Sequence, residues 1–184
     1  MRLVILFLFM TISFSLLADV PLMVKGNSTT DHSPKEITFQ KAEIATVVVF
    51  LSAMCPCSDS HIPYLKKLKE EFPKITFVAI HSNVNEDAKT TEAYFKKVNL
   101  PFDVIQDDEA KIADAFKANK TPHSYIISKE NKILYEGGVT SSAKAHQASE
   151  FFLQQALLDL TQGREIKQKE TRTLGCVISR EKDE

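Results

Sequence analysis

Apolar positions along the chain follow two patterns, continuous runs and stripes with helical spacing. Residues 45–53 are apolar almost throughout and rich in β-branched side chains, which is typical of a strand buried on both faces of a parallel or mixed sheet. Residues 58–72 carry aliphatic side chains on one face and charged ones elsewhere, which predicts an amphipathic helix. Pro63 is expected to kink this helix without ending it.

The remaining elements are shorter. Strands are predicted at 75–80, 104–106, 123–128 and 132–136, and helices at 86–98, 109–116 and 144–160. In the last helix, the side chains expected to face the core are Phe151, Phe152, Ala156, Leu157 and Leu160. Strands and helices alternate first, and a strand pair and a closing helix follow. The order predicts one α/β domain over residues 37–161, with three layers and a central mixed β-sheet flanked by helices.

The N-terminus has a different pattern. Arg2 is followed by an apolar run over residues 3–17, which fits a signal peptide of residues 1–18 and is short for a membrane span. An uncleaved membrane anchor is the alternative. We expect export to the periplasm or the extracellular space, where disulfides persist. Residues 19–36 are interpreted as a lead-in segment, and residues 162–184 as a polar C-terminal tail that carries Gly175-Cys176.

Charge and cysteine content narrow the function. Lys and Arg number 23 and Asp and Glu 24 among 184 residues, so the electrostatic reason to expect a nucleic-acid partner is missing. The chain has three cysteines, too few for a disulfide scaffold, and an odd number cannot all pair internally. At least one thiol must stay free or exchange.

Two of the cysteines stand where chemistry is expected. Cys55-Pro56-Cys57 follows the first strong strand and opens the next helix, and Pro56 suits a first helical position. Unpaired N–H groups and the helix dipole favour an anion there, so we expect the pKa of the Cys55 thiol to be lowered and Cys55 to be a nucleophile. Buried, inert cysteines are the alternative interpretation.

These residues resemble the thioredoxin fold, and specifically the exported redoxin-type proteins related to alkyl hydroperoxide reductase and thiol-specific antioxidant. The likeness is carried by Cys55-Pro56, by Thr121-Pro122 before a later strand, by residues 107–121 and by the tail 174–180. In that family the matching proline is cis and faces the reactive cysteine. The resemblance therefore implies that Thr121 and Pro122, with His123 directly after them, line a substrate groove.

Some positions depart from the family pattern. Thioredoxins have two residues between their cysteines, whereas Ser58 occupies the second cysteine's place here. Related peroxiredoxins have a proline seven positions and a Thr or Ser three positions before the reactive cysteine, and this chain has Val48 and Ser52. We therefore rank thiol peroxidase activity below disulfide exchange.

The cysteine that resolves Cys55 is left open between Cys57 and Cys176. A Cys55–Cys57 bond closes a very small ring and would be easily reduced. A Cys55–Cys176 bond closes a loop of 121 residues, worth roughly 4 to 5 kcal/mol on the chain-entropy model. It requires the tail to fold back, and apolar residues around Gly175-Cys176 suit a docking segment. A mobile terminus is the alternative.

Histidines supply a competing hypothesis. His81, His123 and His61 stand where the topology could bring them near Cys55 and Cys57. Two thiolates and an imidazole suit copper(I), and the pattern is similar to copper-delivering thioredoxin-fold proteins of cytochrome oxidase assembly. The alternative metal ligands are thus Cys55, Cys57, His81 and His123.

The sequence favours an exported thiol-disulfide oxidoreductase with catalytic Cys55, Cys57 and Cys176, and with protein or small-molecule thiols and disulfides as partners. That chemistry needs no cofactor, and contact with a membrane is expected only if the signal segment stays uncleaved. A copper(I) chaperone and a redoxin module stapled by a structural Cys55–Cys176 bond are the other hypotheses.

Overall fold

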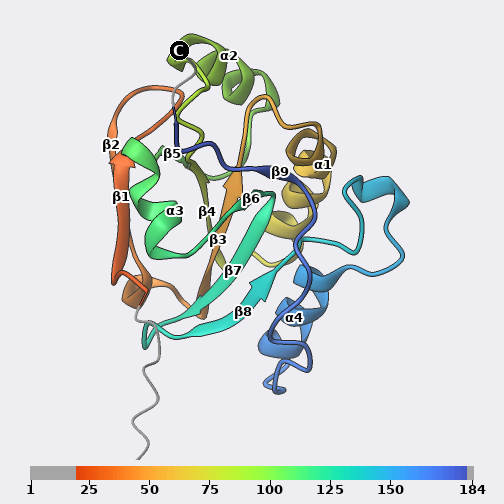
Figure 1. Cartoon of the computed structure of the whole chain (residues 1–184). Helices are drawn as coiled ribbons and strands as arrows, with labels where there is room; N and C mark the ends of the chain where they lie inside the picture. The colour runs from red at the N-terminus through yellow and green to blue at the C-terminus, as the bar shows by residue number, and fades with distance from the viewer. Residues whose placement is uncertain (1–19, 182–184) are drawn as a thin grey trace, which may run out of the picture.

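A five-stranded mixed β-sheet forms the centre of the molecule, and the computed structural model describes residues 20–181 (Figure 1). The strand order is β5-β4-β3-β7-β8. Strands β3, β4 and β5 are parallel, and β7 and β8 add on antiparallel. The strands are β3 (Ala45–Leu51), β4 (Thr76–His81), β5 (Val104–Gln106), β7 (His123–Ser128) and β8 (Ile133–Gly137). All five predicted strands are confirmed.

The central strand β3 is buried along its whole length because both faces of the sheet are covered. Side chains alternate between the faces of a strand. Val47, Val49 and Leu51 belong to one hydrophobic cluster, and Val48 and Phe50 belong to the other. This two-sided burial explains why the sequence of β3 is continuously apolar.

Helices complete the outer layers. They are α1 (Pro56–Glu71), α2 (Ala88–Val98), α3 (Lys111–Ala115) and α4 (Phe152–Thr161), with 3-10 turns at Phe39–Lys41, Asp108–Ala110 and Ala145–Gln147. Side chains of α1, α2 and α4 enter the first cluster, whereas α3 enters the second. The helices α1 and α3 therefore cover opposite faces of the sheet (Figure 1). The helix α1 continues through Pro63.

The last predicted helix was too long at its start. Residues 144–151 form a loop with a 3-10 turn, and α4 begins only at Phe152. The Ser141 hydroxyl accepts the backbone N–H groups of Ser149 and Glu150, and the Ser60 hydroxyl accepts that of Ala145. These side-chain acceptors compete with helical hydrogen bonds. As a result Phe151 is exposed, while Ala156 and Leu157 are buried as expected.

The two ends of the described chain also form strands. The lead-in segment makes an antiparallel hairpin of β1 (Met23–Asn27) and β2 (Pro34–Thr38), which the sequence interpretation did not include. The tail folds back, the arrangement that a Cys55–Cys176 bond requires, and its strand β9 (Cys176–Val177) pairs antiparallel with β6 (Lys120–Thr121). The predicted signal peptide of residues 1–18 lies outside the described residues.

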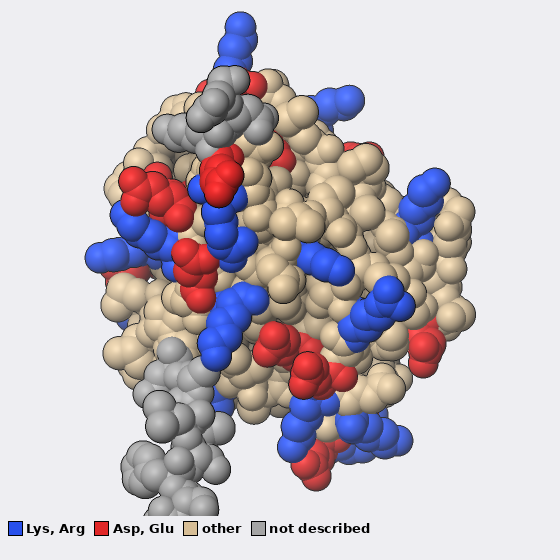
Figure 2. Space-filling model, viewed as in Figure 1, with Lys and Arg blue, Asp and Glu red and all other residues tan. Residues whose placement is uncertain are grey.

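Charges are mixed on the molecular surface. Figure 2 shows Lys and Arg interspersed with Asp and Glu on the face seen in Figure 1, in keeping with a formal net charge of −1. Within residues 20–181, every helix is too short or too polar to cross a membrane.

Candidate active site

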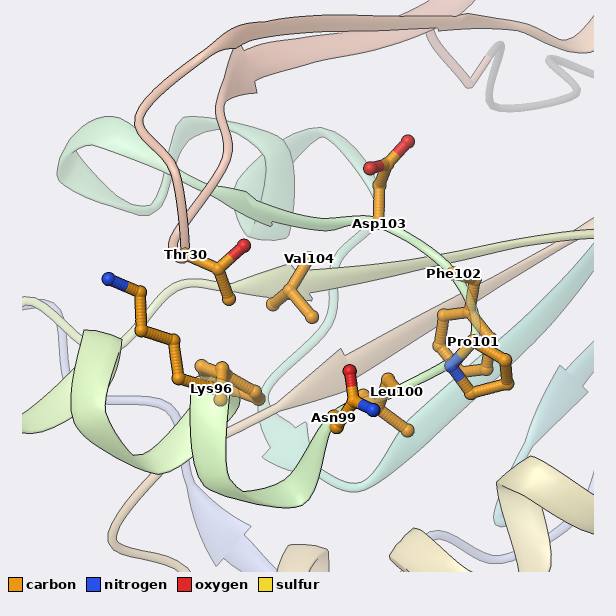
Figure 3. A pocket seen from close by; sticks show the side chains of 9 residues that line it. Thr30, Lys96, Asn99, Leu100, Pro101, Phe102, Asp103 and Val104 are labelled. Carbon is orange, nitrogen blue, oxygen red and sulfur yellow. The ribbon is translucent and has the colours of Figure 1, made fainter.

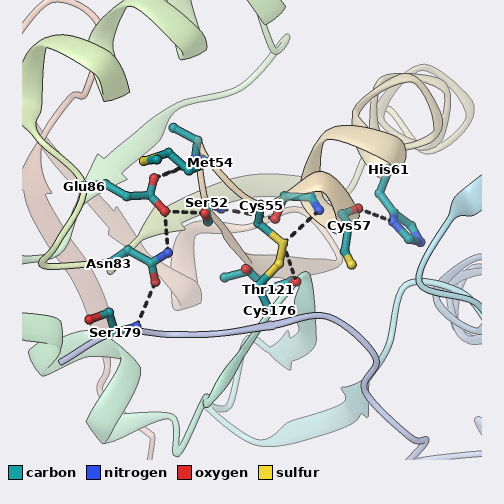
Figure 4. The surroundings of a disulfide bond; sticks show 12 residues. Ser52, Met54, Cys55, Cys57, His61, Asn83, Glu86, Thr121, Cys176 and Ser179 are labelled. Carbon is teal, nitrogen blue, oxygen red and sulfur yellow. Dashed lines mark hydrogen bonds between the residues drawn. A yellow bond between two sulfur atoms is a disulfide. The ribbon is translucent and has the colours of Figure 1, made fainter. Parts of the chain in front are cut away.

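Cys55 is the N-cap residue of α1, three residues of loop after the end of β3 at Leu51 (Figure 4). Its backbone is extended, with φ −87° and ψ 115°, and Pro56 occupies the first turn of the helix. The Ser58 N–H donates to the Cys55 sulfur at 3.5 Å. The first turn of a helix leaves N–H groups without partners and carries a partial positive charge. The Cys55 sulfur therefore lies at the positive end of the α1 helix.

Cys55 is bonded to Cys176 of the C-terminal tail. The two Cα atoms are 6.0 Å apart, and the residues are separated by 121 positions. Cys55 is buried and Cys176 is half-buried. Of the two pairings left open by the sequence, this structure contains the long-range one.

The Thr121–Pro122 peptide bond is cis, as the family resemblance implied. The carbonyl oxygen of Thr121 lies 3.3 Å from the Cys55 sulfur. Thr121 also pairs with Cys176 across the β6 and β9 strands. The tail cysteine is thus held beside the same backbone that borders the Cys55 sulfur (Figure 4).

Cys57 keeps a free thiol and is half-buried. Its sulfur and those of Cys55 and Cys176 all lie within 4.8 Å of one another. Among residues 20–181, this is the one group of three potential metal ligands that comes so close together. The structure therefore brings all three predicted catalytic cysteines into one cluster.

Ser58, which stands where thioredoxins have their second cysteine, is fully buried. Its hydroxyl accepts the Ser52 N–H at 3.2 Å and so ties the helix start to the end of β3. The Ser52 hydroxyl, in turn, donates to Glu86. Of the two peroxiredoxin positions, Val48 is buried within the sheet and Ser52 is engaged by this carboxylate.

Glu86 is a residue that the sequence interpretation missed. Its side chain is 3% exposed and accepts the backbone N–H groups of Ala53 at 2.8 Å and of Met54 at 3.2 Å. The imidazole of His81 lies 3.0 Å away. Glu86 therefore fixes the loop that precedes Cys55, from a position 31 residues farther along the chain (Figure 4).

Burial by itself would raise the pKa of Glu86. Hydrogen bonds from His81, Ser52 and Asn83 outweigh burial and lower the pKa to about 2. A carboxylate that accepts several hydrogen bonds is stabilised in its charged form. Glu86 is therefore an anion at neutral pH. No local motif announces this role, and only its place after the second parallel strand could have suggested it.

The three candidate histidines are buried and occupied by other partners. Both ring nitrogens of His81 have partners, Gln106 and Glu86, each at 3.0 Å. The Nδ1 of His61 is 2.7 Å from the Cys57 carbonyl oxygen, and burial lowers the pKa of His61. Burial, together with the charge of Lys120, lowers the pKa of His123 to about 4. None of these three imidazoles belongs to the group of potential metal ligands that the three cysteine sulfurs form.

A match to a protein-family model covers residues 20–136, and the model is that of the AhpC/TSA family. The chain belongs to the AhpC/TSA family. The match takes in Cys55 and the Thr121–Pro122 pair, and it ends before the tail cysteine. The resemblance inferred from the sequence is confirmed.

Known proteins similar to this AhpC/TSA-family chain include a thiol-disulfide oxidoreductase, ResA, of Halalkalibacterium halodurans. It is 25% identical over 93 residues, which make up 50% of this chain and 53% of that protein. The alignment thus spans about half of the relative's length.

Solved structures support the thioredoxin-like fold. An uncharacterized conserved protein from Geobacillus kaustophilus is 25% identical, with a TM-score of 0.78 over 88% of this chain and 89% of its own. A secreted disulfide oxidoreductase of Mycobacterium tuberculosis is 18% identical, with a TM-score of 0.51 over 61% and 81%. The predicted α/β fold class is confirmed.

A separate pocket of about 380 Å³ lies where α2 ends and β5 begins (Figure 3). Its lining residues are Thr30, Phe95, Lys96, Asn99, Leu100, Pro101, Phe102, Asp103 and Val104. None of the three cysteines borders it. The pocket is therefore separate from the sulfur cluster.

Proposed function

We propose that the protein is an exported thiol-disulfide oxidoreductase in which Cys55 is the nucleophile and Cys176 the resolving cysteine. The observation that carries the proposal is the bond between a helix N-cap sulfur and a sulfur brought in by the tail. Thiolate character is favoured at Cys55 by the helix start. The second sulfur is placed to complete a disulfide once a partner has reacted.

In the proposed cycle, the Cys55 thiolate attacks a partner disulfide and forms a mixed disulfide, and one partner sulfur leaves as thiolate. The Cys176 thiolate then attacks the Cys55 sulfur, which forms the Cys55–Cys176 bond and releases the second partner sulfur. Two electrons pass from the protein to the partner. In the reverse direction the same steps oxidise a partner dithiol.

The test is the Cys55→Ser variant in an exchange assay with a small aromatic disulfide. We expect turnover to fall to the rate of uncatalysed exchange, while the thermal unfolding midpoint under reducing conditions shifts little. Retained turnover would contradict the role of Cys55. A disulfide that forms but resists millimolar dithiothreitol would favour the structural-staple hypothesis, because strained or active bonds exchange readily.

Export is the second part of the proposal, and it rests on the charged and apolar segment of residues 1–18. Expression of the full chain in a bacterial host with a periplasm tests it. We expect a periplasmic product whose N-terminus lies after Ala18. A cytoplasmic, full-length product would contradict export.

Copper(I) binding is a second candidate function, favoured by the three sulfurs that lie within 4.8 Å of one another. Thiolates are the ligands that copper(I) prefers. The cluster replaces the two cysteines and one histidine considered from the sequence, because His81 already has partners at both ring nitrogens.

Titration of the reduced protein with copper(I) against a chelator tests this candidate. We expect sub-micromolar binding that is lost in Cys57→Ser and kept in His123→Ala. Absence of sub-micromolar binding would remove the candidate.

A further inference from the structure

The tail segment around Cys176 lies beside β6 as an added strand (Figure 1). Lys120 pairs with Val177 and Thr121 with Cys176, and the Ile178 N–H donates to the Asn119 carbonyl oxygen at 3.0 Å. This is the geometry by which extended peptides dock on an exposed sheet edge, where the backbone supplies affinity and side-chain sites supply specificity.

The residue before the tail cysteine meets the backbone of the site directly. A Cβ atom on Gly175 would lie 2.0 Å from the Thr121 carbonyl oxygen and 2.7 Å from the Thr121 carbonyl carbon. That carbonyl oxygen also lies 3.3 Å from the Cys55 sulfur. A larger residue at this position would therefore push the following cysteine away from Cys55.

The residues after the tail cysteine alternate in exposure. Val177 is 70% exposed, whereas Ile178 is 2% exposed and belongs to the second hydrophobic cluster, together with Phe116 and Ala118. Successive side chains of a strand point to opposite sides. The first position after the cysteine is thus open to any side chain, and the second is an apolar site.

The strip along residues 119–121 that the tail covers, with the apolar site under Ile178, is called the groove here. We propose that this groove selects partner polypeptides by the pattern Gly-Cys-any-aliphatic in an extended segment, and that the tail is a tethered occupant of the same site. The proposal rests on the proposed function and names its substrate class. Asn119, Thr121 and the apolar site under Ile178 would receive the partner as they receive the tail.

Sharing one groove gives the tail a part in the cycle. The partner docks when the reduced tail leaves. The Cys55 thiolate attacks the partner's disulfide at the docked cysteine, which forms a mixed disulfide, and the partner's other sulfur leaves as a thiolate. The Cys176 thiolate of the returning tail then attacks the Cys55 sulfur, the bond between Cys55 and the partner breaks, and the partner sulfur leaves with the electrons of that bond as a thiolate. Return of the tail and release of the partner are therefore one exchange, and tethering raises the effective concentration of Cys176.

The test uses the full chain with Cys57→Ser and Cys176→Ser, so that Cys55 is its one thiol. The probe is a heptapeptide with the sequence of residues 173–179, Thr-Leu-Gly-Cys-Val-Ile-Ser, activated on its cysteine with thionitrobenzoate. Release of the coloured thiol reports attack by Cys55. Three matched peptides replace the glycine with alanine, the isoleucine with aspartate, or the valine with aspartate.

We expect the alanine and the isoleucine-to-aspartate peptides to react about tenfold more slowly, or slower still, which corresponds to about 1.4 kcal/mol. The valine-to-aspartate peptide should react within about twofold of the parent. Equal rates for all four peptides would overturn the proposed selectivity. Dithiobis(nitrobenzoate) is the control, since failure of Cys55 to attack this small disulfide would contradict the proposed function itself.

Competition by the tail has its own test in the same background. Adding Ile178→Asp should loosen the tail and speed the reaction of the parent peptide about threefold or more, whereas Val177→Asp should leave it unchanged. Circular dichroism establishes that both variants are folded. Equal rates in these two folded variants would overturn the shared groove.

Discussion

The two cysteines of the Cys55–Cys176 bond lie in regions that differ in how firmly the surrounding structure holds the backbone. Around Cys55, a strand buried on both faces passes into a sixteen-residue helix, and the backbone N–H groups of residues 52–54 are taken up by Ser58 and Glu86. Around Cys176, a two-residue strand pairs along one edge, and the neighbouring Val177 is mostly exposed.

Because of this difference, we expect the Cys55 sulfur to stay in place during the reaction and the Cys176 sulfur to move with the tail. The region around Cys55 has its hydrogen bonds satisfied without the disulfide, so we expect it to keep its shape on reduction. The tail loses its covalent tie on reduction and is then held by hydrogen bonds of Ile178, Ser179 and Arg180 and by the buried side chain of Ile178. Asn83 connects the two regions, because its side chain donates to Glu86 and accepts the Ser179 N–H at 3.2 Å. The fixed sulfur is suited to attack and the tail sulfur to arrive and leave.

Removing each candidate resolving thiol in turn tests whether the tail sulfur resolves the mixed disulfide. We expect Cys176→Ser to lower turnover on a peptide disulfide about 100-fold and to leave the partner trapped on Cys55, because resolution then depends on external thiols. In Cys57→Ser, turnover should stay within about threefold of the unmodified chain.

Quenched-flow alkylation followed by mass spectrometry identifies the trapped species. Trapping in Cys57→Ser and normal resolution in Cys176→Ser would reverse the assignment. The sulfur nearer in sequence would then be the resolving one, despite the bond seen in the structure.

The same contrast explains what the sequence could predict. The β3 strand and the α1 helix are recognisable because their apolar pattern is local and follows from burial. The loop at residues 144–151 was wrongly predicted as helix because Ser60, 85 positions away, supplies a competing acceptor to Ala145. Long-range side-chain contacts of this kind leave no periodic signal.

The cysteines of the candidate site could be predicted from the sequence, whereas the residues that hold the loop before Cys55 could not. The position of Cys55 at a predicted helix start indicated a reactive thiol, and the apolar residues around Cys176 indicated that the tail could dock on the domain. The choice between Cys57 and Cys176 depends on how two sulfurs 121 residues apart meet, which the whole fold decides. Glu86 was missed because it acts on the loop before Cys55 through contacts that only the fold creates.

Glu86→Gln is expected to have an intermediate effect, because it removes a charge from the region around Cys55 and conserves its shape. We expect exchange to slow about fivefold and the free energy of unfolding at pH 7 to fall by about 2 kcal/mol, as for loss of charge-assisted hydrogen bonds. Glu70→Gln, on an exposed part of α1, is the matched control.

The pH dependence of stability checks the cause of that loss. The pKa of Glu86 is lowered to about 2 from an ordinary 4.5, so its contribution is present above pH 4.5 and is lost as the pH falls toward 2. Urea unfolding between pH 6 and pH 2 should show a difference between the unmodified chain and Glu86→Gln that shrinks with acid. A difference that stays constant down to pH 2 would mean that the charge is not what stabilises the fold.

His123→Gln should have the smallest effect on exchange, although His123 directly follows Pro122. The imidazole is buried beside Tyr125, with ring centroids 4.6 Å apart. Burial first, and the charge of Lys120 second, lower its pKa to about 4 from 6.5. The folded protein therefore holds a neutral imidazole at neutral pH, and exchange at pH 7 should change less than about twofold.

Stability gives the more sensitive measurement for His123. Between pH 6.5 and 4 the unfolded chain binds a proton that the folded chain does not, so the free energy of unfolding falls as the pH is lowered through that window. His123→Gln should reduce this slope, and the remainder includes the contribution of His61, whose pKa burial also lowers. The variant His146→Gln, in the loop before α4, is the matched control. An undiminished slope in His123→Gln would show that burial does not lower the pKa of His123 in the folded protein, and a fraction of the imidazoles beside Pro122 would then carry a proton at pH 7 during exchange at Cys55.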